Sequence, residues 1–228
     1  EAVTAVGGLL NCNFPTISLQ GGSSTPGVTY TWSGPGGFTS PQQNPPVTNP
    51  GDYTLVVTNP VNGCTSTAIT QVTQDPTVPD VTVQADSLTC STQTITLQAT
   101  TTTPDVSFLW SGPNGFTSTE EDPTTTVPGN YTVVATALSG CTSSFSYNVL
   151  QNVTQPGATA QGVTLTCTSP TGTLTGGSPT AGVSYSWTGP GGFTSNQQNP
   201  TVSNSGTYTL VTTSSNGCTS AISVEVAP

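Results

Sequence analysis

Large hydrophobic and small polar side chains alternate along several short segments of this chain. The alternation is clearest at residues 28–32, 106–110 and 183–187, which read VTYTW, VSFLW and VSYSW. Side chains on a β-strand point to opposite faces in turn, so a period of two is typical of a strand with one buried face. No segment has the spacing of an amphipathic helix. The pattern therefore predicts an all-β protein.

The alternating segments belong to a unit that occurs three times. Each copy has a cysteine 20 residues before a tryptophan, and a tyrosine 21 residues after that tryptophan. A second cysteine follows the tyrosine after 11 residues in the first copy and after 10 in the other two. In chain order these residues are Cys12, Trp32, Tyr53 and Cys64, then Cys90, Trp110, Tyr131 and Cys141, then Cys167, Trp187, Tyr208 and Cys218. A fixed period predicts tandem modules, which we place at residues 1–77, 78–154 and 155–228.

Turn signals divide each copy into about seven short strands. The motif Gly-Pro-x-Gly-Phe follows each tryptophan, and an Asn-Gly or Ser-Gly pair, suited to a tight hairpin, precedes each second cysteine. A tryptophan within an early strand and a tyrosine that opens a late strand are typical of an immunoglobulin-like sandwich. We therefore expect three such β-sandwich domains in a head-to-tail rod. The three tryptophans and the three tyrosines are expected in their cores, with Phe38, Phe116 and Phe193 packed over the sandwich edges.

The charged residues narrow the functions that this chain can have. It contains ten Asp and Glu residues and no Lys, Arg or His, which gives a net charge of −10. A nucleic-acid surface needs basic residues, and general-base catalysis and metal sites most often use His. No apolar run approaches the roughly 20 residues of a membrane-spanning helix. We expect no enzyme activity, cofactor, nucleic-acid partner or membrane insertion, and interpret the chain as a mature product or an excised segment.

Three motifs recur in every copy: W-[ST]-G-P-x-G-F-T-S, G-x-Y-T and G-C-T-S. In this combination the chain resembles the Ig-like and PKD-like repeats found in tandem in very large surface proteins of Bacteroidetes bacteria. The resemblance covers all three copies. It implies a secreted, cell-surface or filament-forming role, and it implies no particular ligand.

The six cysteines allow two pairing patterns, and their regular spacing fits an oxidising compartment. Pairing within repeats gives Cys12–Cys64, Cys90–Cys141 and Cys167–Cys218. Pairing between repeats gives Cys12–Cys141 and Cys90–Cys218, and leaves Cys64 and Cys167 over, one at each end of the rod.

Strand order bears on this choice. If the strands follow immunoglobulin order, the first cysteine of a repeat lies at its downstream end, which faces the following repeat, and the second lies at its upstream end. A strand of six or seven residues separates these ends by roughly 20 Å, whereas a disulfide needs Cα atoms within about 7 Å. Modules can deviate from that order, so both patterns remain open at the level of the sequence.

Two other features are candidate sites. Glu120, Glu121 and Asp122 form the one acidic cluster, a weak candidate for Ca²⁺ binding through oxygen ligands. The first and third copies have Gln-Gln-Asn at that place, so a solvated loop is the favoured interpretation and we predict no metal site. Ser87, within Asp-Ser-Leu, resembles the O-glycan acceptor sequence used by Bacteroidetes.

These observations predict a structural protein of the cell surface or extracellular space. We expect a repeat segment of a fibre, filament or giant adhesin stalk that associates with itself or with further repeats of the same protein. The first alternative is an adhesin module that binds glycans or surfaces. The second is a set of accessory domains of a secreted enzyme.

Overall fold

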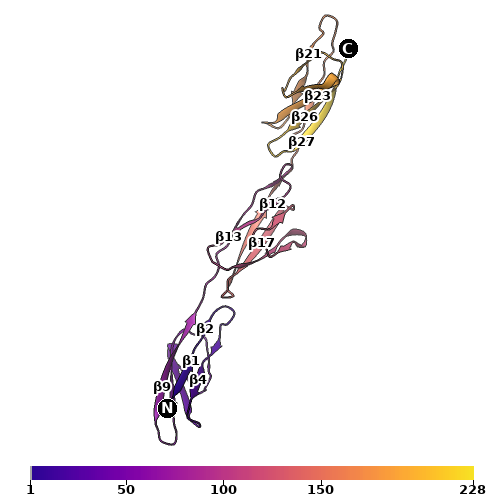
Figure 1. The fold of residues 1–228 in the computed structure, drawn as a ribbon. Helices are drawn as coiled ribbons and strands as arrows, with labels where there is room; N and C mark the ends of the chain where they lie inside the picture. The colour runs from indigo at the N-terminus through magenta and orange to yellow at the C-terminus, as the bar shows by residue number, and fades with distance from the viewer. Residues whose placement is uncertain (1) are drawn as a thin grey trace.

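The alternating segments form strands, and the strands form three β-sandwiches that follow one another along an elongated rod (Figure 1). The computed structural model describes residues 2–228. Apart from three single-turn 3-10 helices, all regular structure in this range is strand. The predicted fold class, tandem immunoglobulin-like sandwiches, is confirmed.

The elements of the three repeats correspond closely. Repeat 1 contains β1 (Val3–Val6), β2 (Leu9–Leu10), β3 (Ile17–Ser18), β4 (Gln20–Ser23), β5 (Thr29–Gly34), η1 (Pro35–Gly37), β6 (Phe38–Ser40), β7 (Pro46–Val47), β8 (Gly51–Thr58) and β9 (Thr65–Gln74). Repeat 2 contains β10 (Thr82–Gln84), β11 (Leu88–Thr89), β12 (Ile95–Thr96), β13 (Gln98–Thr100), β14 (Ser107–Ser111), η2 (Pro113–Gly115), β15 (Thr117–Ser118), β16 (Thr124–Thr125), β17 (Gly129–Thr136), β18 (Thr142–Val149) and β19 (Gln151–Asn152). Repeat 3 contains β20 (Thr159–Gln161), β21 (Gly172–Thr173), β22 (Thr175–Gly177), β23 (Ser184–Gly189), η3 (Pro190–Gly192), β24 (Phe193–Ser195), β25 (Thr201–Val202), β26 (Gly206–Thr213) and β27 (Thr219–Val226).

Each sandwich has one long sheet and one face made of short strand pairs. In repeat 1 the long sheet has the order β2-β9-β8-β5-β6, in which β2 runs parallel to β9 and the other neighbours are antiparallel. The opposite face consists of the antiparallel pairs β1–β4 and β3–β7. The first strand thus begins on one face as β1 and crosses to the other as β2, which brings the chain to the downstream end of the module just before its first cysteine.

The period-two alternation places one face of each long strand in the core. Strands β8, β17 and β26 share one pattern, in which the third, fifth and seventh positions are buried and alternate with partly buried ones. The three tryptophans and the three tyrosines are at most 1 % exposed. Three separate hydrophobic clusters result, one in each repeat. Residues 77 and 154 lie in the segments without strands between β9 and β10 and between β19 and β20.

The recurrent glycine-proline motif packs around the core tyrosine. In repeat 1, a Cβ on Gly34 would lie 2.4 Å from the ring of Tyr53, so this strand position admits no side chain. Phe38 meets the same ring edge-on, with the ring centroids 5.4 Å apart. The hydroxyl of Tyr53 donates a hydrogen bond to the carbonyl of Asn49, four residues upstream, as in the tyrosine corner of immunoglobulin domains. The same arrangement recurs in both other repeats, so the motif serves packing.

Candidate functional site: the junctions between repeats

The two disulfides of the structure join consecutive repeats. Cys12 is bonded to Cys141 and Cys90 to Cys218, and the Cα atoms are 5.0 Å apart in each pair. The first cysteine of each pair lies in the turn after the strand that crosses to the long sheet. The second lies in the hairpin between the last two long strands of the following repeat. The structure therefore has the pairing between repeats, and the pairing within repeats is not formed.

The core explains why a disulfide within each repeat is unnecessary. In antibody domains the inter-sheet disulfide has one cysteine two residues after the corner tyrosine. Here that position is Leu55, and it packs in the same cluster as Leu19 from the opposite face; both side chains are fully buried. Aliphatic packing takes the place of the internal bond, and the cysteines lie at the ends of the module instead.

The first junction combines the Cys12–Cys141 bond with hydrogen bonds from the same hairpin. The amide of Asn13 donates to the carbonyl of Ser139 at 3.3 Å. The Ser139 hydroxyl donates at 2.8 Å to the carbonyl of Thr77, which belongs to the connecting segment. Ser139 and Cys141 are each 2 % exposed. The hairpin of repeat 2 thus contacts both the turn of repeat 1 and the linker.

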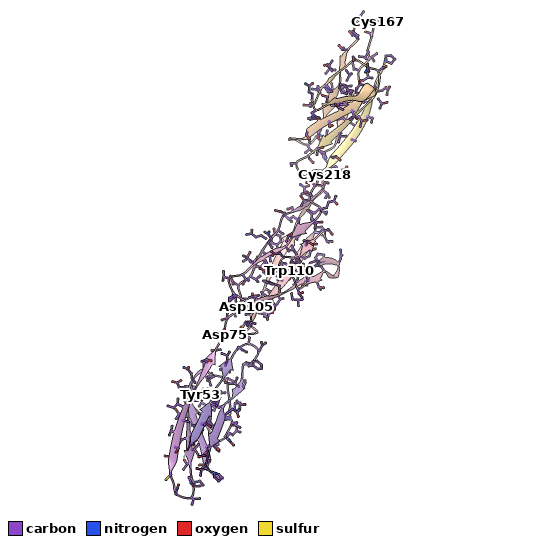
Figure 2. The ribbon with its side chains drawn as sticks, in the orientation of Figure 1. Tyr53, Asp75, Asp105, Trp110, Cys167 and Cys218 are labelled. Atoms are coloured by element: carbon purple, nitrogen blue, oxygen red, sulfur yellow. A yellow bond between two sulfur atoms is a disulfide. The ribbon has the colours of Figure 1, made fainter. Side chains whose placement is uncertain are left out.

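The second junction uses an asparagine for the same purpose. The Asn216 amide group donates to the carbonyl of Asn152, the last residue of β19, at 3.3 Å and to that of Thr154, in the linker, at 3.0 Å. The carbonyl of Asn216 accepts a hydrogen bond from the amide of Ser91 at 3.4 Å. Figure 2 shows Cys218 where the second and third sandwiches meet.

The linkers are also attached to the repeat that follows them. Asp80 accepts hydrogen bonds from the Thr102 amide and from the hydroxyls of Thr101, Thr102 and Thr103. The Thr102 amide is the main cause that lowers the pKa of Asp80 to about 2, with smaller contributions from the threonine hydroxyls. In the second linker the carbonyl of Pro156 accepts hydrogen bonds from the hydroxyls of Ser178 and Thr180.

Two covalent connections therefore cross each junction, one through the linker and one through the disulfide. A pair of domains joined by a single linker can bend and twist relative to each other unless their interface is large and hydrophobic. A second connection at a separate point removes most of these motions. The arrangement therefore restricts how neighbouring sandwiches can move relative to each other.

Cys64 and Cys167 have no disulfide partner and are exposed. Cys64 lies in the hairpin between β8 and β9, the place that Cys141 and Cys218 occupy in their own repeats. Cys167 lies in the turn that corresponds to those of Cys12 and Cys90, and Figure 2 shows it at the far end of the rod, beyond the third sandwich.

The acidic cluster has a structural role. The Asp122 carboxylate accepts the amide of Ala99 at 2.9 Å, and Asn44 and Asn199 hold Gly21 and Gly176 in the same way. Glu120 accepts the indole N–H of Trp110 through its backbone carbonyl. Among residues 2–228, no three His, Cys, Asp or Glu side chains are placed to hold a metal ion.

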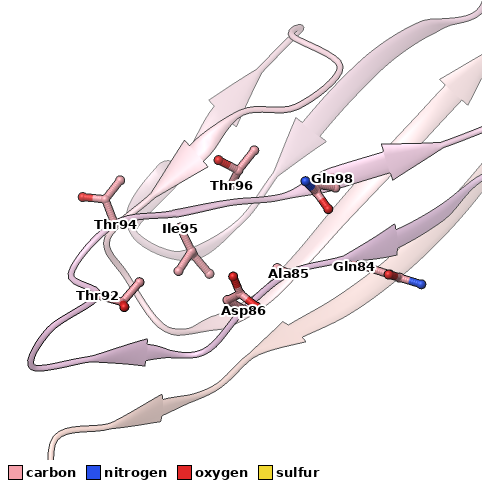
Figure 3. Close-up of a pocket in the computed structure, with 8 residues that line it drawn as sticks. All are labelled: Gln84, Ala85, Asp86, Thr92, Thr94, Ile95, Thr96 and Gln98. Atoms are coloured by element: carbon pink, nitrogen blue, oxygen red, sulfur yellow. The ribbon is translucent and has the colours of Figure 1, made fainter. Parts of the chain in front are cut away.

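Ser87 is exposed and lies in the segment where the first strand of repeat 2 changes sheets. The adjacent hollow, of about 330 Å³, lies between the segment that carries Asp86 and the one that carries Ile95 and Thr96 (Figure 3). Its lining is mostly Thr and Gln side chains. The crossing separates β11 from β10, which opens this space. In the described part of the chain no helix is long and apolar enough to cross a membrane.

No family model and no curated protein matches the chain. Among solved structures, the chain is similar to one described as "Structural insight into host cell surface retention of a 1.5-MDa bacterial ice-binding adhesin". The TM-score is 0.58 at 12 % identity, over 99 % of this chain and 96 % of that chain. The three N-terminal domains of the bacteriophage RB49 Highly Immunogenic Outer Capsid protein match with a TM-score of 0.37 at 13 % identity, over 99 % and 94 % of the two chains. The likeness to the adhesin shows the fold, a row of Ig-like domains.

The sequence motifs gave no indication of how the hairpin residues Ser139 and Asn216 hold the linkers, since a short polar residue before Gly-Cys also suits an unattached hairpin.

Proposed function

We propose that the chain is a stiff extracellular spacer, a repeat segment of a surface fibre, filament or adhesin stalk. The observation that carries this proposal is the second covalent connection at each junction. A binding module needs a suitable pocket, whereas a spacer needs a fixed angle between its domains. Four cysteines of this chain form disulfides between consecutive repeats, which restrict that angle.

Three further features support the proposal. Disulfides persist outside the cytosol, which favours an extracellular or cell-surface location. The recurrent motifs resemble those of Bacteroidetes surface proteins, and we assign the chain to that setting. The absence of Lys and Arg from the sequence leaves trypsin-like proteases no bond to cleave, an advantage for a durable exposed material.

Small-angle X-ray scattering of a Cys64→Ser/Cys167→Ser variant tests the proposal without interference from the end cysteines. The oxidised chain should scatter as one rigid rod of three sandwiches. Reduction should shorten the mean end-to-end distance and broaden its distribution, because each junction then has only its linker and its hydrogen bonds. An oxidised chain that is as flexible as the reduced one would contradict a spacer role.

Glycan binding is a second candidate, favoured by the polar hollow of repeat 2. Asp86, Gln84 and Gln98 place carboxylate and amide groups at one concave surface, and such groups hydrogen-bond sugar hydroxyls. A glycan array probed with the wild type and with Asp86→Ala tests this candidate. Binding lost in the variant would support it, and no binding by either protein would reject it.

A further inference from the structure

Cys167 lies in a turn like that of the bonded Cys90. Cys64 ends a hairpin that has one residue more than those of Cys141 and Cys218 but shares their Gly-Cys end. From these correspondences we infer that Cys167 of one chain forms a disulfide with Cys64 of a second copy, so that the rod continues end to end. The inference rests on the proposed spacer function and adds its partner, a second copy of this chain joined at a junction of the internal type.

The hairpin of Cys64 matches the bonded hairpins at its Gly-Cys end. Gly63 has φ 70°, and Gly140 and Gly217 have φ 77° and 74°. Each hairpin is closed by two backbone hydrogen bonds of 2.8–3.0 Å. The Asn62 side chain accepts the Cys64 amide at 3.0 Å, as the Asn216 side chain accepts that of Cys218 at 3.1 Å. The extra residue of this hairpin lies between Asn59 and Gly63, before the Gly-Cys end that would pair.

The turn of Cys167 has the same hydrogen bonds as the turn of the bonded Cys90. The amide of Thr166 donates to the carbonyl of Ser169 at 3.0 Å, and the Thr89 amide donates to the Thr92 carbonyl at 2.8 Å. In both turns the first threonine hydroxyl accepts the amide of the fourth residue, at 3.0 and 2.9 Å. It also bonds the hydroxyl of the third residue at 3.1 Å. Cys167 therefore occupies the same place in its turn as the bonded Cys90.

The hairpins differ in the space next to their glycine. A Cβ on Gly140 would lie 2.1 Å from the Asn13 side chain, and one on Gly217 would lie 2.5 Å from Ser91. A Cβ on Gly63 would meet nothing within 4 Å. The residue after a turn cysteine thus fills the space over the hairpin glycine at both internal junctions, and over Gly63 the same space is open.

The two ends also match each other in residue type. The second junction joins a Thr-Cys-Ser turn to an Asn-Gly-Cys hairpin, and the chain ends present a Thr-Cys-Thr turn and an Asn-Gly-Cys hairpin. Thr168 takes the place of Ser91 and offers the same amide and hydroxyl to the carbonyl of Asn62. Residues 59–64 and 164–172 contain no charged side chain, so like charges do not oppose the approach.

The bond forms by thiol–disulfide exchange with a low-molecular-weight disulfide such as oxidised glutathione. The Cys64 thiol loses its proton and attacks one glutathione sulfur, which releases the other as a glutathione thiolate. The deprotonated Cys167 of the second copy then attacks the Cys64 sulfur and releases the second glutathione. Two protein thiols are oxidised to one disulfide, and one glutathione disulfide is reduced to two thiols, which take up the two protons. Because the two surfaces differ, the contact is heterologous and produces open chains.

The test uses the full chain in a glutathione redox buffer, with Cys64→Ser and Cys167→Ser variants incubated singly and as an equimolar mixture. Thiol counting on denatured samples first verifies that both internal disulfides are present. The mixture should give roughly tenfold more disulfide-linked dimer than either variant alone, because only Cys167–Cys64 pairing can form the contacts of the internal junctions between two chains. The wild type should form a ladder of multimers.

Equal amounts of dimer in all three samples would overturn the inference, since chance pairing of exposed thiols predicts that result. No dimer in the mixture, with one accessible thiol counted on each variant, would overturn it as well. Neither result would affect the spacer function, which the scattering experiment tests on chains that lack both end cysteines.

Discussion

At the scale of single residues, the invariant features of the repeats serve packing. Tyr131 is held between Gly112 and the edge of Phe116, and its hydroxyl bonds the Val127 carbonyl. The sequence predicted that the tryptophans and tyrosines lie in the core, because their alternation with polar residues is local. It could not predict the close approach of glycine and tyrosine, since these residues are distant in sequence and meet only across two paired strands.

Gly112→Ala should therefore destabilise repeat 2. The added Cβ would lie 2.5 Å from the Tyr131 ring, and overpacking of this kind costs about 1–3 kcal/mol. Hydrogen exchange of β17 peptides, followed by mass spectrometry, would measure the loss of protection. Thr117→Ala, at an exposed position of the neighbouring strand β15, is the control and should leave exchange of β17 nearly unchanged. Equal effects of the two substitutions would contradict the packing role.

Asp80 should make stability depend on pH in the acid range. Its pKa of about 2 in the folded chain lies below the ordinary value of about 3.9. A carboxylate with a lowered pKa stabilises the fold above its unfolded pKa, and this stabilisation is lost as the pH falls through the folded pKa. The melting temperature should therefore fall between about pH 4 and pH 2, and less so in Asp80→Asn. Asp86→Asn, which also removes one exposed carboxylate, should behave as the wild type. If both variants change the profile alike, the threonine contacts of Asp80 are not the cause.

At the scale of elements, the hairpin before each second cysteine decides how repeats connect. Its existence follows from the Asn-Gly and Ser-Gly pairs, which specify a local turn. The sequence does not specify which cysteine bonds to the cysteine of this hairpin, because the same cysteine spacing fits pairing within repeats and pairing between repeats. The positions of Cys12 and Cys141 become neighbours only when the first strand has crossed between sheets and two modules are stacked. For the same reason the interpretation of Glu120 to Asp122 as a solvated loop missed the bond from the Ala99 amide to Asp122.

The hairpin glycines provide a matched comparison. Gly140→Ala and Gly63→Ala both place a side chain at a positive φ, which costs about 1–2 kcal/mol. Only the first also displaces Asn13 of the preceding repeat. We expect the Cys12–Cys141 disulfide to be reduced faster by dithiothreitol in Gly140→Ala than in Gly63→Ala, measured by alkylation and mass spectrometry. Identical reduction rates would mean that the glycine contact does not support the junction.

At the scale of the whole molecule, the disulfides limit how far the rod can be stretched. The shortest covalent path from end to end leaves the main chain at Cys12, returns from Cys141 to Cys90 and crosses to Cys218. It contains roughly 70 residues and reaches about 250 Å when fully extended. Without the disulfides the chain would extend to about 800 Å.

Single-molecule pulling from the two termini should show this difference. The oxidised chain should reach its limit at about a third of the extension of the reduced chain, because residues 13–89 and 142–217 lie outside the covalent path. The Cys64→Ser/Cys167→Ser variant is the control and should behave as the wild type. Full extension of the oxidised chain would be incompatible with the disulfides described above.

The claim on which all of this depends is the connection of consecutive repeats by disulfides, and peptide mapping tests it most directly. The free thiols of the unreduced, denatured chain are alkylated, and the protein is digested with chymotrypsin, because trypsin has no site. We predict one linked pair that contains Cys12 and Cys141, a second that contains Cys90 and Cys218, and alkylation of Cys64 and Cys167 in the monomer. A peptide that links Cys12 to Cys64, or Cys90 to Cys141, would contradict the account.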